Sequence, residues 1–301
     1  MTGKRTHRDS SGFSMIELVT TIALTGILTV GLTNLLRHPM QGYVAVSRRA
    51  ELVALADISM RRMSRDLRRA LPNSVRVAGG GTVLELLHTS GGARYRLEPG
   101  VNDAGGPDEE DHTNASDWLS FGGDTSWNTL GRFENLAFSY GTPLPAGTRV
   151  AIYPTGDSVW SEAASGSNPS SITPSGTTLT VVDDNDEEQL QLSSSHRFEL
   201  ESPSSRLYVV DTPVTYLCDL AGEALWRVDG YTIASAQPTS LAAAPLSAGN
   251  AARAADRVER CAFDYVAGTP TRAGLITIEI VLVSAEERVR LLQQVQVHNA
   301  P

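Results

Sequence analysis

Hydrophobic and polar residues divide the chain into one long apolar segment near its N terminus and many short alternating segments after it. The apolar segment, Phe13–Leu36, is interrupted only by Glu17, Asn34 and several hydroxyl side chains. A helix needs about 20 apolar residues, each rising about 1.5 Å, to cross a bilayer. The pattern therefore predicts a transmembrane helix over about 13–36.

The helical pattern continues beyond this apolar segment. Strong helix formers follow, and no proline stands between Pro39 and Pro72. Apolar residues recur at helical spacing at Leu52, Leu55, Met63, Leu67 and Leu71. We predict one N-terminal helix over 13–72, kinked or loosened at Pro39.

After Pro72 the pattern changes to short segments with period-two alternation and glycine-rich turns, which is typical of an antiparallel sheet. The last two segments, 275–284 and 288–298, predict a C-terminal hairpin. The other candidate strands are Ser74–Val77, Val83–His88, Ala93–Leu97, Leu136–Tyr140, Arg149–Tyr153, Thr177–Val182, Arg197–Leu200, Leu207–Val210, Thr215–Leu220, Ala224–Val228 and Cys261–Tyr265. We expect an α+β chain with a large β-rich head over 73–301.

Three segments between the strands predict loops. Val101–Ser116 is acidic and rich in glycine, and Ala163–Thr178 is rich in Ser, Pro and Gly. Ala234–Ala255 is rich in alanine, so a short helix is expected within it.

The residues that flank the apolar segment predict its orientation. Lys4, Arg5 and Arg8 precede it against Asp9, which places residues 1–12 in the cytoplasm. A cleaved secretory signal is the alternative, but its apolar core is usually only about 7–15 residues long and ends at an A-x-A type site. Here the segment ends at "NLLRHPMQG" instead.

The overall charge changes the expected partners. The formal net charge is −9, whereas a nucleic-acid-binding protein normally presents a basic face. We therefore expect no nucleic acid as a partner. The arginines at 61, 62, 65, 68 and 69 are interpreted as a solvated helix face or as contacts with acidic neighbours.

The stretch "GFSMIEL", which begins at Gly12, is similar to the cleavage and methylation signal of type IV pilins and type II secretion pseudopilins. The resemblance implies that a prepilin peptidase cuts between Gly12 and Phe13 and methylates the new amino terminus of Phe13. Glu17 then becomes the fifth mature residue. The resemblance also implies a pilin-like fold, in which the second half of a long N-terminal helix packs on a globular head.

Glu17 is an acid in a segment expected to lie in lipid, where an ionisable side chain is costly and by default functional. After cleavage, the α-amine of Phe13 on a neighbouring subunit could pair with it in a low dielectric. Glu17 would then fix the register of subunits that join a filament. The alternative is an acid tolerated near the membrane edge.

Several stretches of the head resemble the MshO minor pilins of the mannose-sensitive haemagglutinin (MSHA) pilus. These stretches are "GGARYRLEPG", "LGRFENL", "RLYVVDTPVTYLCD", "ALWRVDGY", "CAFDY" and "LLQQVQVHNAP". The resemblance implies a minor pilin that acts in pilus assembly initiation or in the tip complex. A type II secretion pseudopilin is one alternative, and a tip adhesin or DNA-uptake binding module is another.

The resemblance also implies where the chain works. It would be a single-pass protein of the bacterial inner membrane, with its head in the periplasm or at the pilus tip on the cell surface. Its partners would be other major and minor pilins, the prepilin peptidase, the inner-membrane assembly platform and inner-membrane lipid.

The chain has two cysteines, Cys218 and Cys261, each inside a candidate strand. A head exported to the periplasm lies in an oxidising compartment, where disulfides form and persist. We therefore predict a disulfide between them, with two buried free thiols as the alternative.

Candidate catalytic and metal-binding patterns are weak. "GDSV" at Gly156–Val159 echoes a lipase nucleophile block, but it lies in mid-chain without the distant His and Asp pattern. The six histidines show no zinc spacing, and "DDNDEE" at Asp183–Glu188 lacks the alternation of an EF-hand loop. We expect no enzyme activity, no cofactor and no metal, and interpret the acidic turn as solvated rather than as a loose calcium site.

Overall fold

The computed structural model describes residues 12–99, 114–133, 135–268 and 272–297. Its longest element is the helix α1, Met15–Arg68, whose backbone continues without a break through Pro39. The chain divides into two compact units, Met1–Glu51 and Leu52–Pro301, and each is described by itself. The second unit therefore begins at Leu52, inside the predicted N-terminal helix. The sequence predicts a head that begins later, at residue 73.

The helix ends four residues before the predicted boundary because the chain then joins a sheet. The amide of Leu71 donates to the carbonyl of Leu87 (2.8 Å), and the amide of Thr89 donates to the carbonyl of Arg69 (2.8 Å). Pro72 has no amide hydrogen with which to continue the helix.

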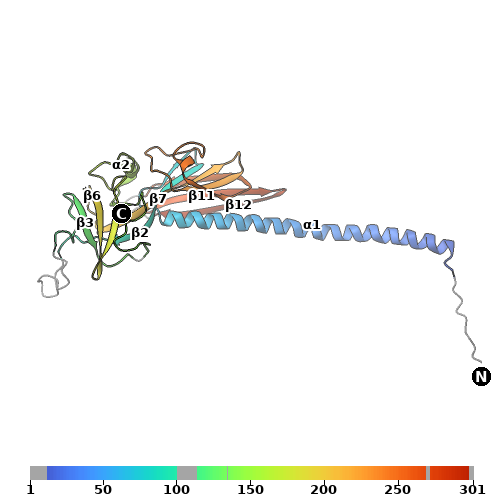
Figure 1. Ribbon diagram of the computed structural model, residues 1–301. Helices are drawn as coiled ribbons and strands as arrows, with labels where there is room; N and C mark the ends of the chain where they lie inside the picture. Colours follow the sequence, from blue (N-terminus) through green and yellow to red (C-terminus); the bar gives the residue numbers. More distant parts are fainter. Residues whose placement is uncertain (1–11, 100–113, 134, 269–271, 298–301) are drawn as a thin grey trace, which may run out of the picture. The chain divides into compact units, whose positions relative to one another are not determined.

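The second unit is built from antiparallel strands (Figure 1). A six-stranded sheet has the order β1–β2–β7–β8–β9, with β4 also paired to β7; the other two sheets have the orders β10–β11–β12 and β3–β6–β5. The strands are β1 Arg76–Ala78, β2 Val83–Arg94, β3 Asp124–Thr129, β4 Arg149–Ile152, β5 Leu179–Asp184, β6 Glu187–His196, β7 Arg206–Asp219, β8 Ala224–Asp229, β9 Asn250–Ala255, β10 Val258–Val266, β11 Gly274–Ser284 and β12 Glu287–Val297. Short helical elements are η1 Gly156–Ser158, α2 Val159–Ser165 and η2 Leu246–Ala248.

The largest hydrophobic core lies between the second half of α1 and two sheets. Leu52, Met63 and Leu67 of α1 are at most 1% exposed, as the helical stripe in the sequence predicts. They belong to one cluster with side chains of the six-stranded sheet and of β10–β11–β12, including Tyr216 and Ile278. Each such side chain contributes about 1.5–3 kcal/mol on burial, so this packing fixes the helix to the sheets.

A buried charged group also links α1 to the six-stranded sheet. The Asp66 carboxylate accepts hydrogen bonds from the Tyr216 hydroxyl (2.8 Å) and from Nε of Arg227 (2.7 Å). Arg227 also pairs with Asp229. A buried carboxylate without such partners would be strongly destabilising, so these contacts specify one orientation of the helix.

A second core lies in the part of the unit that contains β3–β6–β5. Trp127 and Phe198 meet edge to face with ring centroids 5.7 Å apart, and Val181 and Leu190 are fully buried beside them. Figure 1 shows β3 and β6 at one end of the unit and β11 and β12 at the other.

The expected C-terminal hairpin is confirmed, because β11 and β12 pair from Gly274↔Val297 to Ser284↔Glu287. Two candidate strands are wrong, since Leu136–Tyr140 and Arg197–Leu200 contain no strand. The candidates Leu207–Val210 and Thr215–Leu220 form one strand, β7, which continues through Pro213 beside a register shift on β2.

The alanine-rich segment Ala234–Ala255 contains only the three-residue η2 and then β9, in place of a helix. Its last residues pair with β8 from Leu225↔Ala255 to Asp229↔Asn250. Pairing in the sheet outweighs the intrinsic helix preference of alanine there. The predicted loop Ala163–Thr178 begins inside α2.

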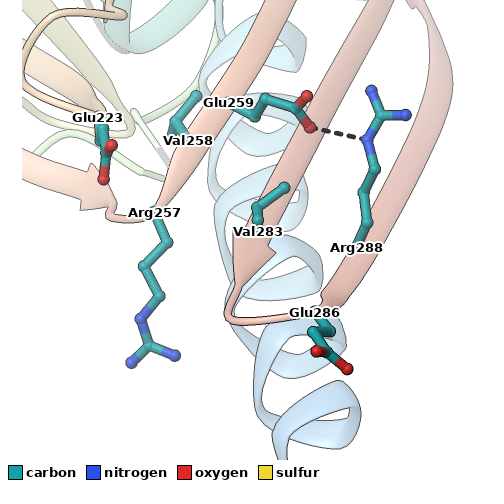
Figure 2. A pocket seen from close by; sticks show the side chains of 7 residues that line it. All are labelled: Glu223, Arg257, Val258, Glu259, Val283, Glu286 and Arg288. Atoms are coloured by element: carbon teal, nitrogen blue, oxygen red, sulfur yellow. Dashed lines mark hydrogen bonds and ion pairs between the residues drawn. The ribbon is translucent and has the colours of Figure 1, made fainter.

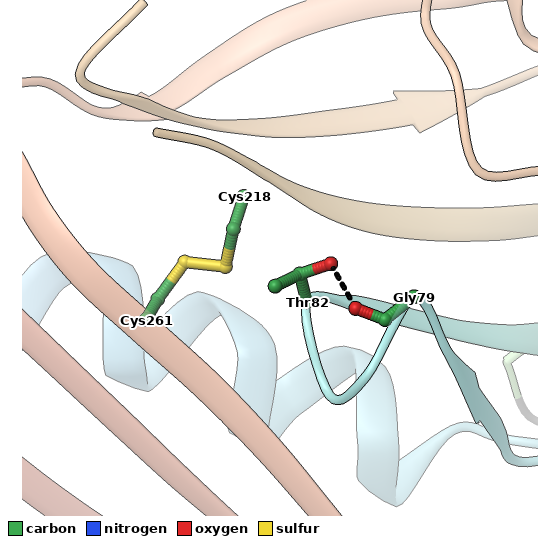
Figure 3. The surroundings of a disulfide bond; sticks show 4 residues. All are labelled: Gly79, Thr82, Cys218 and Cys261. Atoms are coloured by element: carbon green, nitrogen blue, oxygen red, sulfur yellow. Dashed lines mark hydrogen bonds between the residues drawn. A yellow bond between two sulfur atoms is a disulfide. The ribbon is translucent and has the colours of Figure 1, made fainter. Parts of the chain in front are cut away.

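The predicted disulfide between Cys218 and Cys261 is present, and it joins the end of β7 to β10 (Figure 3). The turn Gly79–Thr82 lies beside it, and the carbonyl of Thr82 accepts from the amide of Cys218 (3.0 Å). Gly81 has φ +91°, and a Cβ there would lie 3.0 Å from the carbonyl oxygen of Phe263. This close approach requires glycine and ties β10 to the turn.

Replacing both cysteines by alanine is expected to destabilise the second unit. The bridge closes a loop with a sequence separation of 43 residues, and constraining such a loop in the unfolded chain is worth about 4 kcal/mol. The unfolding temperature should fall by roughly 10 °C, measured by circular dichroism on the full chain in detergent. Reduced wild type should match the double variant, and an unchanged midpoint in both would contradict this account.

Candidate functional site: the start of the N-terminal helix

Gly12 and Phe13 precede α1, and the first turn of the helix places Glu17 close behind them. The carbonyl of Ser14 accepts hydrogen bonds from the amides of Glu17 and Leu18, both at 3.1 Å. Glu17, the predicted assembly residue, therefore lies in the first turn of α1, and the predicted cleavage residues Gly12 and Phe13 lie shortly before that turn. Gly12, Phe13 and Glu17 are all exposed in the first unit, Met1–Glu51.

The first part of α1 carries apolar side chains on all sides. Met15, Ile16 and Ile22 are 86%, 75% and 65% exposed. Residues Met15–Leu32 have a mean hydropathy of 1.9, so this segment is long and apolar enough to cross a membrane. A membrane anchor and a signal sequence both satisfy this criterion, and either would remove this surface from water.

Glu17 is the one carboxylate of this apolar segment. Its side chain is exposed and forms no ion pair or hydrogen bond within the described part of the chain. Its position in the first helical turn, beside the positive end of the helix dipole, favours a negative charge by about 0.3–1 kcal/mol. That gain is small beside the cost of a carboxylate in lipid, so a membrane location would require a further partner.

Four threonine hydroxyls of the apolar segment, at positions 20, 21, 25 and 29, donate to carbonyls of their own helix. Thr21 donates to the carbonyl of Glu17 (2.8 Å), Thr25 to that of Thr21 (2.6 Å) and Thr29 to that of Thr25 (2.7 Å). Satisfied hydroxyls can lie in hydrocarbon at low cost. The last three of these threonines line a shallow groove with Gly26, where another helix could approach closely.

The acidic turn Asp183–Glu188 proves to be part of the β5–β6 hairpin. Glu187 and Glu188 are 4% and 2% exposed, so the expectation of a fully solvated turn is wrong for these two side chains. Nε of Arg96 donates to Glu187 (3.0 Å), while the amide of Phe133 (2.6 Å) and the Tyr140 hydroxyl (2.7 Å) donate to Glu188. These two carboxylates therefore have structural partners.

Other candidate patterns do not form a recognisable catalytic or metal site. The Ser158 hydroxyl of "GDSV" donates to the carbonyl of Thr155 (3.4 Å) at the start of α2. In the described ranges, no group of three or more His, Cys, Asp or Glu side chains is placed to hold a metal ion. The acidic loop Val101–Ser116 lies largely outside the described residues.

A pocket beside the β10–β11–β12 sheet has charged residues of both signs (Figure 2). Within it, Nε of Arg288 donates to Glu259 (2.7 Å) across the strands. Both side chains are largely exposed, so this pair contributes little to stability. Glu223, Arg257 and Glu286 complete the charged rim without forming a cluster around one point.

The predicted arginine-rich face lies on the second half of α1. Arg61, Arg65, Arg68 and Arg69 are exposed and line a groove with Gln293 of β12. Arg61 pairs with Asp57 one helical turn away (2.8 Å). The other three face solvent near the C-terminal end of the helix, where positive charge is favourable, which agrees with a solvated face.

Comparison of the chain with models of known protein families, with curated proteins and with solved structures gave no match. A functional interpretation therefore depends on the residues and geometry of the chain itself.

Proposed function

We propose that the chain is a prepilin that becomes a minor pilin of an MSHA-type type IV pilus. The observation that carries this proposal is the order of residues at the helix start: Gly12, then Phe13, then Glu17, then an apolar helix. Cleavage after Gly12 by a prepilin peptidase would remove residues 1–12 and free the amine of Phe13. The chain would then be the substrate of an enzyme rather than an enzyme.

The mature helix would act as the assembly element. Its apolar surface would lie in the inner membrane before assembly and against other pilin helices afterwards. The Glu17 carboxylate would pair with the Phe13 amine of a neighbouring subunit, since each charge alone would be costly in a low dielectric. The pair would set the register in which subunits join.

The β-rich unit would select partners at the base or tip of the filament. It holds three sheets and several separate hydrophobic cores, the largest of which includes the second half of α1. Such a large head would crowd a tightly packed helical shaft, which favours a low-copy subunit in assembly initiation or the tip complex. The head would lie in the periplasm or at the cell surface, where the disulfide can persist.

Deletion of the gene, with filaments and secreted proteins measured in parallel, tests this proposal. Scarce shearable pili with normal secretion are expected, and a plasmid copy of the gene should restore them. Normal pili with lost secretion would overturn the pilus assignment in favour of a type II secretion pseudopilin. Normal pili, normal secretion and lost binding to surfaces or DNA would instead favour an adhesin or uptake module.

A further inference from the structure

Arg149 is a buried arginine with no counter-charge paired to it in the part of the chain that the structure describes. Arg149 opens β4 and pairs in register with Val210 of β7, and it is only 6% exposed. Within the described residues no carboxylate forms an ion pair with it, and its Nε is buried without a hydrogen-bond partner. Burial alone lowers the pKa of its guanidinium from the ordinary value.

Arg149 makes one polar contact, which accounts for only part of its hydrogen-bonding capacity. One terminal nitrogen, Nη1, donates to the carbonyl of Ala163 in α2 (2.6 Å). A guanidinium presents five N–H donors in a fixed planar fork that matches a carboxylate. A buried charge left without a partner is strongly unfavourable, so an external anion would relieve this cost.

Arg149 also lines a cleft of about 460 Å³. This volume is within the range of about 300–1,000 Å³ that is usual for small-molecule sites. Ala146, Gly147 and Ala164 form part of its wall, and their small size leaves room for a ligand beside the guanidinium. No Cβ contact would arise within 4 Å at Gly147, which agrees with open space there.

The rest of the cleft is suited to hydroxyl groups rather than to a second negative charge. Ser175 and Thr232 line it, are exposed, and have hydroxyls with no hydrogen-bond partner in the described part of the chain. Asp211 also lines it, and its Oδ1 accepts from Nδ1 of His88 (2.7 Å) and from the amide of Thr212 (2.9 Å). A carboxylate at this end would repel an anion but would accept hydrogen bonds from ligand hydroxyls.

We propose that this cleft binds a small hydroxylated carboxylic acid of the sugar-acid class, whose carboxylate pairs with Arg149. The hydroxyls of the ligand would face Ser175, Thr232 and Asp211. The site is independent of the proposed assembly role, because Glu17 and the apolar segment take no part in it.

The test uses the purified full chain in detergent and titrates D-glucuronate, D-glucose and acetate by ligand-detected NMR. D-Glucuronate should bind about tenfold or more tightly than D-glucose, because only its carboxylate can form the charge-assisted pair. It should also bind more tightly than acetate, which lacks the hydroxyls. The proposal would be overturned if D-glucuronate did not bind. It would also be overturned if D-glucose or acetate bound as tightly as D-glucuronate.

Two variants assign the binding to this cleft. Arg149→Met keeps an unbranched apolar side chain, and it should weaken D-glucuronate binding by about tenfold or more without lowering the unfolding temperature. Ala164→Phe should fill the cleft and weaken binding while Arg149 stays in place. Arg260→Met on β10 is the matched control, because its side chain is 62% exposed and outside the cleft. Unchanged binding in both cleft variants, or equal loss in the control, would contradict the proposal.

Discussion

Replacing Gly12 by leucine is expected to leave residues 1–12 attached to nearly all of the protein. The proposed peptidase would require a residue without a side chain on the leader side of the cut, and leucine places a branched chain there. The free α-amine of Phe13 would not form, so the variant should remain in the membrane and be absent from filaments. N-terminal sequencing and intact mass measurement of the membrane fraction would show the retained leader.

Ser11→Ala is the matched control, since it changes the neighbouring leader residue and keeps Gly12. It should be processed like the wild type. A Gly12→Leu protein whose N terminus is still Phe13 would remove the peptidase interpretation. A product cut after residue 36 in both variants would show instead that the apolar segment is an ordinary signal peptide.

The sequence predicts the N-terminal helix well because two independent signals agree there. The length of the apolar segment predicts the first part of the helix. The spacing of Leu52, Met63 and Leu67 predicts the buried face of its second part. The exact end at Arg68 was not predictable, because it depends on pairing of Leu71 with Leu87, a contact distant in sequence. Helix boundaries are decided by such tertiary contacts more often than by propensity.

The sequence analysis did not predict the strands β3, β6 and β9. For β6 and β9 the cause is that some of their residues are unusual in a sheet. The strand β6 begins with Glu187, and sequence alone does not show that Arg96 would bury and pair with this acid. Likewise β9, Asn250–Ala255, has alanines where branched residues are usual, and it becomes a strand only because β8 offers an edge.

The candidate sites also differ in whether the sequence alone reveals them. Gly12, Phe13 and Glu17 can be proposed from the sequence as a processing and assembly site, because their order forms a local motif. Arg149 cannot, because its significance lies in an absence: a guanidinium buried beside a cleft with no described carboxylate paired to it. Only the placement of β4 against β7 and α2 shows this.

Replacing Glu17 by alanine is expected to leave cleavage after Gly12 intact and to prevent incorporation into filaments. Removing one partner of an ion pair in a low dielectric leaves the other charge uncompensated, at a cost of about 3–5 kcal/mol. This cost corresponds to more than about a hundredfold in the equilibrium for adding a subunit. Immunoblots of sheared filaments and of membranes would give the incorporated fraction, and mass measurement would confirm cleavage.

Three variants separate charge pairing from the alternative of an acid tolerated near the membrane edge. Glu17→Asp keeps the charge on a shorter side chain and should retain part of the incorporation, whereas Glu17→Gln keeps the size without the charge and should fail like alanine. Thr20→Ala, on the same helix, removes a hydroxyl that, among the described residues, bonds only to the carbonyl of Glu17 (3.0 Å). This variant should assemble normally. If the alanine and glutamine variants assemble as well as the wild type, Glu17 is an acid tolerated near the membrane edge. Its replacement would then remove the cost of a charge in lipid without breaking any pairing between subunits.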